Sequence, residues 1–421
     1  MARASTSSLE DTTPQLNRAL RRWLVNELTT LRPAIVQNAA ACQADRYRKH
    51  FDTLTHACLL LFHSLSGSRS LRQSYAAFPE CTGLAALCRW QDETAVSYAQ
   101  FAASNSSRPP EFLAGLIPAL AQRVLRVDPR ADLPADLHVL DGTRLHLPQS
   151  LVPWQTCHNG VGVQVCYRPA LDLPERVVIL QDEKITDYQG MDQTILDDPS
   201  CRDLLRDQTV TFDLGYHSHD RFRDLLDAGI HFVTRYHPQA RLQILADLPC
   251  AQSFRALPDH RIRVLADQRV LLGSPNNRRT KKLLLLRMVT ATVAPLPRAV
   301  RTGAATITYQ ILTDRIDLEA MQVVQLYLYR WHIELFFRWL KRVIKLVRPL
   351  GTASRTVVTL SVWLAVLIHL LTVLAAHALG LPRRSPTLLF LLHAILYSLH
   401  PILSEHPPPP VQLPLFPPGF L

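Results

Sequence analysis

Acidic residues are nearly absent from one long part of the sequence. Between Glu319 and Glu405 there is a single one, Glu334, and it lies in a stretch rich in Arg, Lys and large apolar residues, YLYRWHIELFFRWLKRVIKL. Over all 421 residues, 46 Lys and Arg outnumber 35 Asp and Glu, which gives a net charge of +11. This surplus predicts an anionic partner, and composition alone does not decide between nucleic acid and a membrane surface.

Paired cysteines are also absent. The eight cysteines form no CxxC pair, and their spacing resembles neither a zinc motif nor a small disulfide scaffold. Cys157 and His158 are the only adjacent thiol and imidazole, and ordinary packing is favoured there over a metal or nucleophile role. The first residues carry acids and lack the apolar core of a signal peptide. We therefore expect reduced thiols and a cytoplasmic protein.

Charged residues are missing from Val357 to Leu379, a stretch long enough to span a bilayer. A stripe of small and polar residues along one helical face opposes that interpretation, because it suits a helix buried in protein on one side and less apolar on the other. A membrane span remains the alternative at this point. The stripe consists of Ser361, Ala365, His369, Thr372 and Ala376.

The chain is too long for one compact core, and its texture changes along its length. Residues 1 to about 130 have apolar clusters at helical spacing, interrupted by polar and Pro-containing breaks. From His138 onward, short β-favouring runs alternate with helical ones, as in QTVTFDLGYHSHDRFRDLLDAGIHFVTRYH. This alternation predicts a layered α/β core. The stretch from Pro238 to about Arg315 is irregular and rich in strands.

Two acids follow apolar strands. Asp141 ends LHVLD and Asp213 ends VTFD, and each is followed by a Gly within two residues. Open α/β sheets place functional groups at the carboxyl ends of strands. Asp is also common as a cap of the following turn, so for either residue alone the structural role stays the stronger alternative.

Glu334 has a more distinctive context. We expect one long helix from about Leu318 to Val347, and at about 100° per residue its basic residues share one face with Glu334 while the opposite face is apolar. An alternative is that Glu334 only forms i,i+4 pairs with Arg330 and Arg338, which contribute a few tenths of a kcal/mol each. The expected basic face comprises Tyr327, Arg330, Glu334, Arg338, Lys341, Lys345 and Arg348.

Phosphodiester hydrolysis would explain one acid within a basic face. Divalent cations that activate water and stabilise the leaving oxygen take carboxylate ligands, and two such ions lie about 4 Å apart in two-metal sites. Two strand-borne Asp and one helix-borne Glu could converge on such ions. The flanking Arg and Lys residues would then bind the phosphates beside the cut.

The chain resembles a known family at these residues. The spacing Tyr327-x₂-Arg330-x₃-Glu334-x₆-Lys341 matches the Y-R-E-K signature of bacterial insertion-sequence transposases, the DDE group that includes the fourth insertion-sequence family. LDGTRL resembles the first-Asp motif of that family, DLGYHSHDRFRDLLDAGIHFVTR its second and LYLYRWHIELFFRWLK its third. The resemblance covers about Leu137 to Leu379 and is weaker in the N-terminal third.

The resemblance implies an α/β, ribonuclease-H-like core with a β-rich insertion between the second Asp and the Glu. It implies that Asp141, Asp213 and Glu334 hold Mg²⁺ or Mn²⁺, with two ions expected. The implied organisation is a helical region for DNA binding or dimerisation, a catalytic domain with the insertion, a helical region and a Pro-rich tail. Their expected bounds are 1–130, 131–350 with the insertion at about 238–315, 351–405 and 406–421.

The resemblance also implies DNA contacts. The Tyr, Arg and Lys of the signature are expected to contact phosphates near the transposon end, and Trp331 is expected to pack in the core more than to stack on a base. Apolar C-terminal helices recur in similar proteins, so we expect no membrane span. The residues expected to bind DNA are Tyr327, Arg330, Lys341, Arg338 and Lys345.

The implied activity is metal-dependent hydrolysis at the ends of a transposable element, which releases 3′-OH groups for strand transfer into target DNA. A homodimer on paired terminal inverted repeats is expected. Two alternatives remain. One is a nuclease of the same fold without strand transfer, and the other is a DNA-binding derivative that no longer catalyses.

Overall fold

The computed structural model describes most of the chain. The expectations for Cys157 and His158, and for the Pro-rich tail, lie outside the described residues. These are 13–46, 51–66, 68, 70–90, 96–146, 160–180, 187–249, 254–256, 260–273, 283–295, 306–346, 350 and 354–381.

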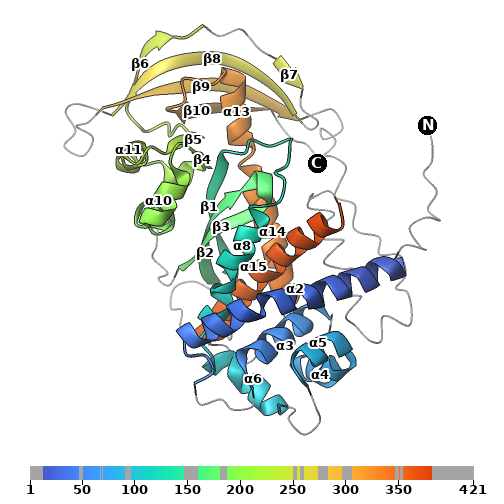
Figure 1. The fold of residues 1–421 in the computed structure, drawn as a ribbon. Coiled ribbons are helices and arrows are strands. Elements are labelled where there is room, and N and C mark those ends of the chain that lie inside the picture. Colours follow the sequence, from blue (N-terminus) through green and yellow to red (C-terminus); the bar gives the residue numbers. More distant parts are fainter. Residues whose placement is uncertain are drawn as a thin grey trace, which may run out of the picture.

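The N-terminal part is helical, as its apolar periodicity predicts (Figure 1). Local capping explains several helix starts. Asp52 accepts a hydrogen bond from the backbone of Thr55, and Ser97 forms a capping box with Gln100. The elements are α2 (Thr13–Ala41), α3 (Thr53–Leu65), α4 (Leu71–Ala77), the 3₁₀ turn η1 (Phe78–Glu80), α5 (Thr82–Leu87), α6 (Tyr98–Ser107), α7 (Glu111–Ala114) and α8 (Leu116–Val124).

One large mixed sheet follows, which confirms the expected α/β class. Its strand order is β3-β2-β1-β4-β5-β10-β9-β8-β6, with β7 paired to β8. β4 runs parallel to β1 and to β5, and the other pairings are antiparallel. The strands are β1 (Leu137–His146), β2 (Gly160–Arg168), β3 (Leu173–Leu180), β4 (Thr209–Phe212), β5 (His231–Arg235), β6 (Leu242–Asp247), β7 (Phe254–Ala256), β8 (His260–Leu272), β9 (Leu284–Pro295) and β10 (Ile307–Thr313).

Helices cover the sheet, and the described residues form three apolar cores. One core joins the N-terminal helices, α14 and α15 to one face of β1–β3. A second packs α10 and α11 against the sheet, and a third packs α13 against β8, β9 and β10. The elements are η3 (Pro169–Leu171), α9 (Asp187–Met191), the π-helical turn η4 (Asp192–Leu196), α10 (Pro199–Leu205), η5 (Leu214–Tyr216), α11 (His219–Asp227), α13 (Ala320–Leu328), α14 (Trp331–Leu346) and α15 (Arg355–Ala378).

The expected single helix from about Leu318 to Val347 is wrong. α13 ends at Leu328 and α14 begins at Trp331, with Tyr329 and Arg330 in a turn between them. The backbone tightens here, since the Arg330 N–H donates to the Tyr327 carbonyl and the Ile333 N–H to the Arg330 carbonyl, at 3.1 and 3.2 Å. Such i→i+3 bonds replace the regular helical ladder over one turn. The expected basic face therefore comes from two helices and their junction.

α15 is long and apolar enough to cross a membrane by length and composition, and 78% of its most apolar 18-residue window is buried inside the protein. His369 and Thr372, from the small and polar stripe, are buried as well. The Nε2 atom of His369 lies 2.7 Å from the carbonyl oxygen of Asp172, which follows η3. The stripe thus faces other parts of the chain.

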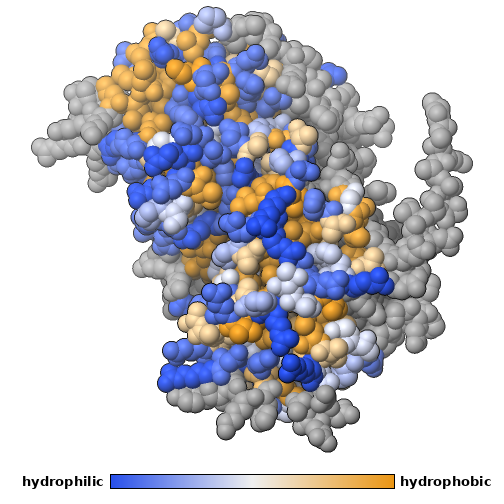
Figure 2. Space-filling model, in the orientation of Figure 1, coloured by the Kyte–Doolittle hydropathy of each residue, from blue (hydrophilic) through white to orange (hydrophobic). Residues whose placement is uncertain are grey.

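The far end of the sheet exposes apolar side chains (Figure 2). β6 lies at the edge of the sheet and carries Ile244 and Leu245, which are 52% and 46% exposed. Leu265 on β8 and Leu285 on β9 are exposed to a similar degree. This end of the sheet is remote from the N-terminal helices in Figure 1.

Candidate active site

Strand pairing brings Asp141 and Asp213 side by side. β1 and β4 pair in parallel, and their last partners are Leu140 and Phe212, so each Asp is the next residue along its chain. The expectation that Asp141 ends its strand is wrong in one respect, because β1 continues to His146 while paired with β2 alone. Asp141 nevertheless lies where the parallel pairing ends, at the position that favours functional groups.

The junction between α13 and α14 brings basic and polar groups to these acids. The Nη1 atom of Arg330 lies 3.1 Å from Asp141 Oδ2 and 3.3 Å from Glu334 Oε1. The Tyr327 hydroxyl donates to Asp213 Oδ1 over 3.2 Å. The three acids predicted from the sequence therefore lie together at the junction of α13 and α14.

The three acids Asp141, Asp213 and Glu334 carry more negative charge than the single guanidinium of Arg330 neutralises. Burial raises the pKa of Asp141 to about 6, and the nearby Glu334 and Asp213 carboxylates add to this effect. Arg330 and the Gly142 N–H, which donates to Asp141 Oδ1 over 2.8 Å, act in the opposite direction. Burial and the neighbouring Asp213 also raise the pKa of the Tyr327 hydroxyl. Several carboxylate oxygens lie here with one guanidinium as their positive partner. Such a set of oxygen ligands fits a hard divalent cation such as Mg²⁺ or Mn²⁺.

The metal-free protein should lose stability as the pH rises from about 4 to about 6. The ordinary pKa of Asp141 is 3.8 and its folded pKa is about 6, so the folded state retains a proton that the unfolded chain releases. The stabilising contribution is complete below the unfolded pKa and is lost as the pH passes the folded one. It amounts to at most about 3 kcal/mol.

Denaturant unfolding in a chelating buffer at several pH values measures this effect. Asp141→Asn removes the titrating group and should lack this component of the pH dependence. Parallel stability curves for the parent and the variant would contradict the expectation.

Gln164 packs closely against Gly142, the residue after Asp141. A Cβ atom at Gly142 would lie 2.4 Å from Gln164 Oε1, and Gln164 in turn donates to the hydroxyl of Tyr216. The buried pair of Gln164 and Tyr216 thus supports the strand next to Asp141. Neither residue could be recognised from the sequence, because nothing in their spacing relates them.

A fourth acid also lies near the cluster. Asp187, the first residue of α9, has its Oδ2 atom 2.4 Å from the position of a Cβ at Gly215, two residues after Asp213. Burial and the charge of Asp213 raise the pKa of Asp187. Asp187 could not be recognised from the sequence, since it follows no strand and lies outside the motifs.

α14 docks as its apolar face predicts. Ile333, Phe336 and Leu340 are buried, and the Phe336 ring stacks on Tyr167 with ring centroids 5.1 Å apart. Tyr327 is buried too, so it does not lie on an open basic face. The apolar face confirms the helical spacing within α14, although the helix begins later than expected.

The expectation that Trp331 packs in the core is wrong. Trp331 is 44% exposed, and the guanidinium of Arg338 lies over its ring, 5.1 Å from the centroid. Lys341 is half-buried, and the side chain of Lys345 lies outside the described residues. The DNA contacts of these residues therefore remain predictions.

The chain matches a known protein family. The family model described as "Transposase DDE domain" matches residues 133–371, more than half of the chain. The chain belongs to this family. The matched segment includes Asp141, Asp213 and Glu334 and extends into α15. Membership supports transposase activity in general, an enzyme of DNA transposition that acts on DNA and uses a divalent metal.

A curated relative agrees with this assignment. The protein named "Putative transposase y4zB" from Sinorhizobium fredii is 27% identical over 314 residues, which cover 73% of this chain and 80% of the relative. The aligned length exceeds the matched family segment, so the similarity is not confined to the part with the three acids.

Proposed function

We propose that this transposase is a cut-and-paste enzyme of a bacterial insertion sequence from the Y-R-E-K group. It would cleave the ends of its element by metal-dependent hydrolysis and join the released 3′-OH groups to target DNA. One observation carries the proposal. Asp141 and Glu334 both form ion pairs with the Nη1 atom of Arg330, and Asp213 accepts a hydrogen bond from the Tyr327 hydroxyl beside them. All five residues lie within the family segment.

A ribonuclease-H-like core is part of this proposal. It is supported by the strand order β3-β2-β1-β4-β5 and by the parallel run of β1, β4 and β5. The β-rich insertion would comprise β6 to β10, since these strands extend the same sheet beyond β5. The expected domain bounds stay proposals, with residues 1–130 binding DNA or forming a homodimer on paired inverted repeats. A cytoplasmic, nucleoid-associated location follows from this function.

The three acids would hold two Mg²⁺ or Mn²⁺ ions, which when bound supply activation of water and stabilisation of the leaving oxygen. Asp141 would give up the proton that burial lets it retain below about pH 6. Among the described residues, the side-chain hydrogen bonds of Arg330 run through Nη1, so its other guanidinium nitrogens could bind a phosphate. Tyr327 would keep Asp213 oriented through its hydroxyl hydrogen bond.

Trp331 and Arg338 form an exposed pair beside Glu334 that suits contact with DNA. Trp331→Ala should weaken DNA binding by about 1–3 kcal/mol, the contribution of one aromatic ring that stacks on a base. Thermal unfolding should change little, because the ring is 44% exposed. Binding titrations with end DNA measure the first effect and calorimetry the second.

Leu204→Ala is the matched control, since Leu204 is an apolar residue of α10 that is 49% exposed. Its DNA affinity should equal that of the parent. Equal affinity of Trp331→Ala and the parent would contradict a role of Trp331 in DNA binding.

The experiment that tests the function uses the DNA that flanks the gene. Terminal inverted repeats there should bind the purified protein, and with Mg²⁺ the protein should cut at their ends and join them to a target plasmid. Cutting without joining would favour a nuclease of the same fold. Binding without cutting would favour a DNA-binding derivative, and the absence of binding to these repeats would contradict the proposal.

A further inference from the structure

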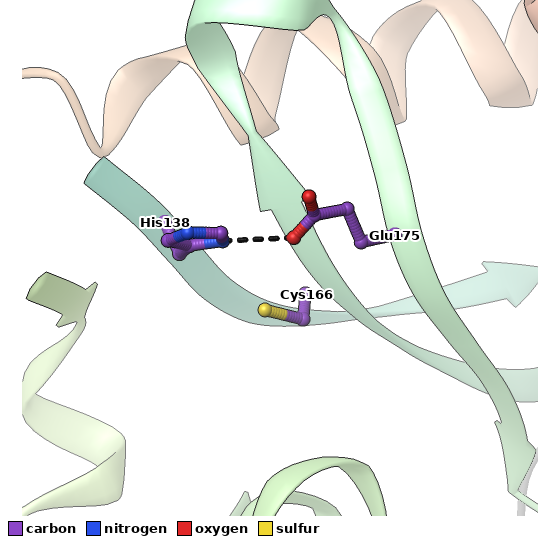
Figure 3. Close-up of side chains that lie close together, drawn as sticks. All are labelled: His138, Cys166 and Glu175. Carbon is purple, nitrogen blue, oxygen red and sulfur yellow. Dashed lines mark ion pairs between the residues drawn. The ribbon is translucent and has the colours of Figure 1, made fainter. Parts of the chain in front are cut away.

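A second group of ligand-type side chains lies inside the sheet, apart from the three acids. His138 on β1, Cys166 on β2 and Glu175 on β3 converge from neighbouring strands (Figure 3). One ligand atom from each lies within 4.8 Å of the others. The side chains of His138 and Glu175 are 1% and 6% exposed, and Cys166 is 1% exposed.

Strand register explains how these residues meet. Cys166 is opposite Leu140 on β1, and His138 precedes Leu140 by two residues, so both side chains point to the same face. Between β2 and β3, Cys166 pairs with Arg176 and Tyr167 pairs with Pro174, which leaves Glu175 as the extra residue of a bulge. A bulge redirects a side chain. Without it, alternation would turn Glu175 away from Cys166.

An ion pair alone leaves this group poorly satisfied. His138 Nδ1 lies 2.9 Å from Glu175 Oε2, yet neither ring nitrogen of His138 nor Glu175 Oε2 has a hydrogen bond of acceptable geometry among the described residues. Arg168 Nη1 is 3.6 Å from the other carboxylate oxygen. Buried polar atoms without hydrogen bonds are costly and rare. A cation between the three ligand atoms would satisfy them together.

We propose that His138, Cys166 and Glu175 bind one structural zinc ion. A thiolate, an imidazole nitrogen and a carboxylate oxygen are ligand types that zinc takes, and a water would complete the tetrahedron. The charges of the thiolate and the carboxylate would balance those of Zn²⁺. The thiol proton, which burial of Cys166 retains in the metal-free protein, is released when the ion binds.

This site would differ from the one at Asp141 in the metal that it selects. Mg²⁺ takes oxygen ligands, whereas a thiolate favours softer ions such as Zn²⁺. His138 is three residues before Asp141 on β1. A zinc ion there would link β1 to β2 and β3 close to Asp141. It would stabilise the sheet rather than take part in cleavage.

The test uses the full chain with Asp141→Asn, Asp213→Asn and Glu334→Gln, so that the three acids contribute no metal binding. After purification in Mg²⁺ buffer, one zinc per chain is expected by elemental analysis. Replacement by Co²⁺ should give thiolate-to-cobalt absorption in the near ultraviolet. Adding Cys166→Ser should remove both the zinc and this absorption.

Cys201→Ser is the matched control, because Cys201 is a buried thiol of the same core that lies outside the group. It should keep the zinc and the cobalt absorption. Absence of both from the background chain, or their loss with Cys201→Ser and retention with Cys166→Ser, would overturn the proposal.

A second measurement covers the case in which Cys166→Ser does not fold. The thermal midpoint of the background chain should fall when zinc is removed by a chelator and should recover when zinc is added. A shift of roughly 1 °C or more is expected, because the entropy of unfolding scales with chain length and this chain has 421 residues. An unchanged midpoint would overturn the proposal.

Discussion

Glu334→Gln is expected to lower the rate of end cleavage by at least about 10²–10³-fold, the loss seen when one preorganised electrostatic group is removed from an active site. The amide is similar in size and can still accept a hydrogen bond from Arg330, which lies 3.3 Å from Glu334. It is a much weaker ligand for a divalent cation than a carboxylate. DNA binding and thermal stability should therefore be retained while single-turnover cleavage is lost.

Glu111→Gln provides the control for loss of one negative charge. Glu111 is an exposed acid at the start of α7, and its variant should cleave like the parent. A Glu334→Gln variant that cleaves within about threefold of the parent would remove Glu334 from the site, whatever the fate of the two Asp residues.

Arg287→Ala is expected to destabilise the fold by about 3–5 kcal/mol, the cost of breaking a buried ion pair by removing one partner. Arg287 on β9 bonds to both carboxylate oxygens of Asp267 on β8, at 2.8 and 2.6 Å, and both side chains are nearly fully buried. Its Nη1 atom also donates to the carbonyls of Arg315 and Leu318, just before α13. The variant would thus leave a buried carboxylate and two carbonyls without their donor.

Equilibrium unfolding in denaturant measures this change. Arg261→Ala is the control, because Arg261 is an exposed arginine on β8 and its replacement should alter stability by no more than about 0.5 kcal/mol. A similar small effect from Arg287→Ala would show that the chain tolerates the uncompensated Asp267.

The sequence predicts those parts of the fold that depend on local periodicity. Short β-favouring runs identify β4 and β5, and the apolar face of α14 is buried as its spacing requires. The break at Tyr329 and Arg330 could not be predicted in this way. Neither residue is a helix breaker, and the contact of Arg330 with Asp141 is tertiary.

The residues of the candidate sites also fall into those that local sequence signals predict and those that depend on tertiary packing. Asp141, Asp213 and Glu334 could be predicted because each occurs in a motif with local signals, whereas Asp187 reaches Gly215 only through the packing of α9. The group of His138, Cys166 and Glu175 has no sequence spacing of its own, because a bulge in β3 creates it.

The parallel pairing of β1 with β4 has a consequence for how this chain can vary in length. Asp141 and Asp213 each follow the last paired residues, Leu140 and Phe212, so their alignment is measured in strand register. One residue inserted within β1 before Asp141 would turn the acid to the opposite face of the sheet, whereas insertions in the connections between strands would leave it in place. Functional homologues should therefore differ in length between these strands and not within them, and a deletion scan across residues 137–146 would reveal this boundary residue by residue.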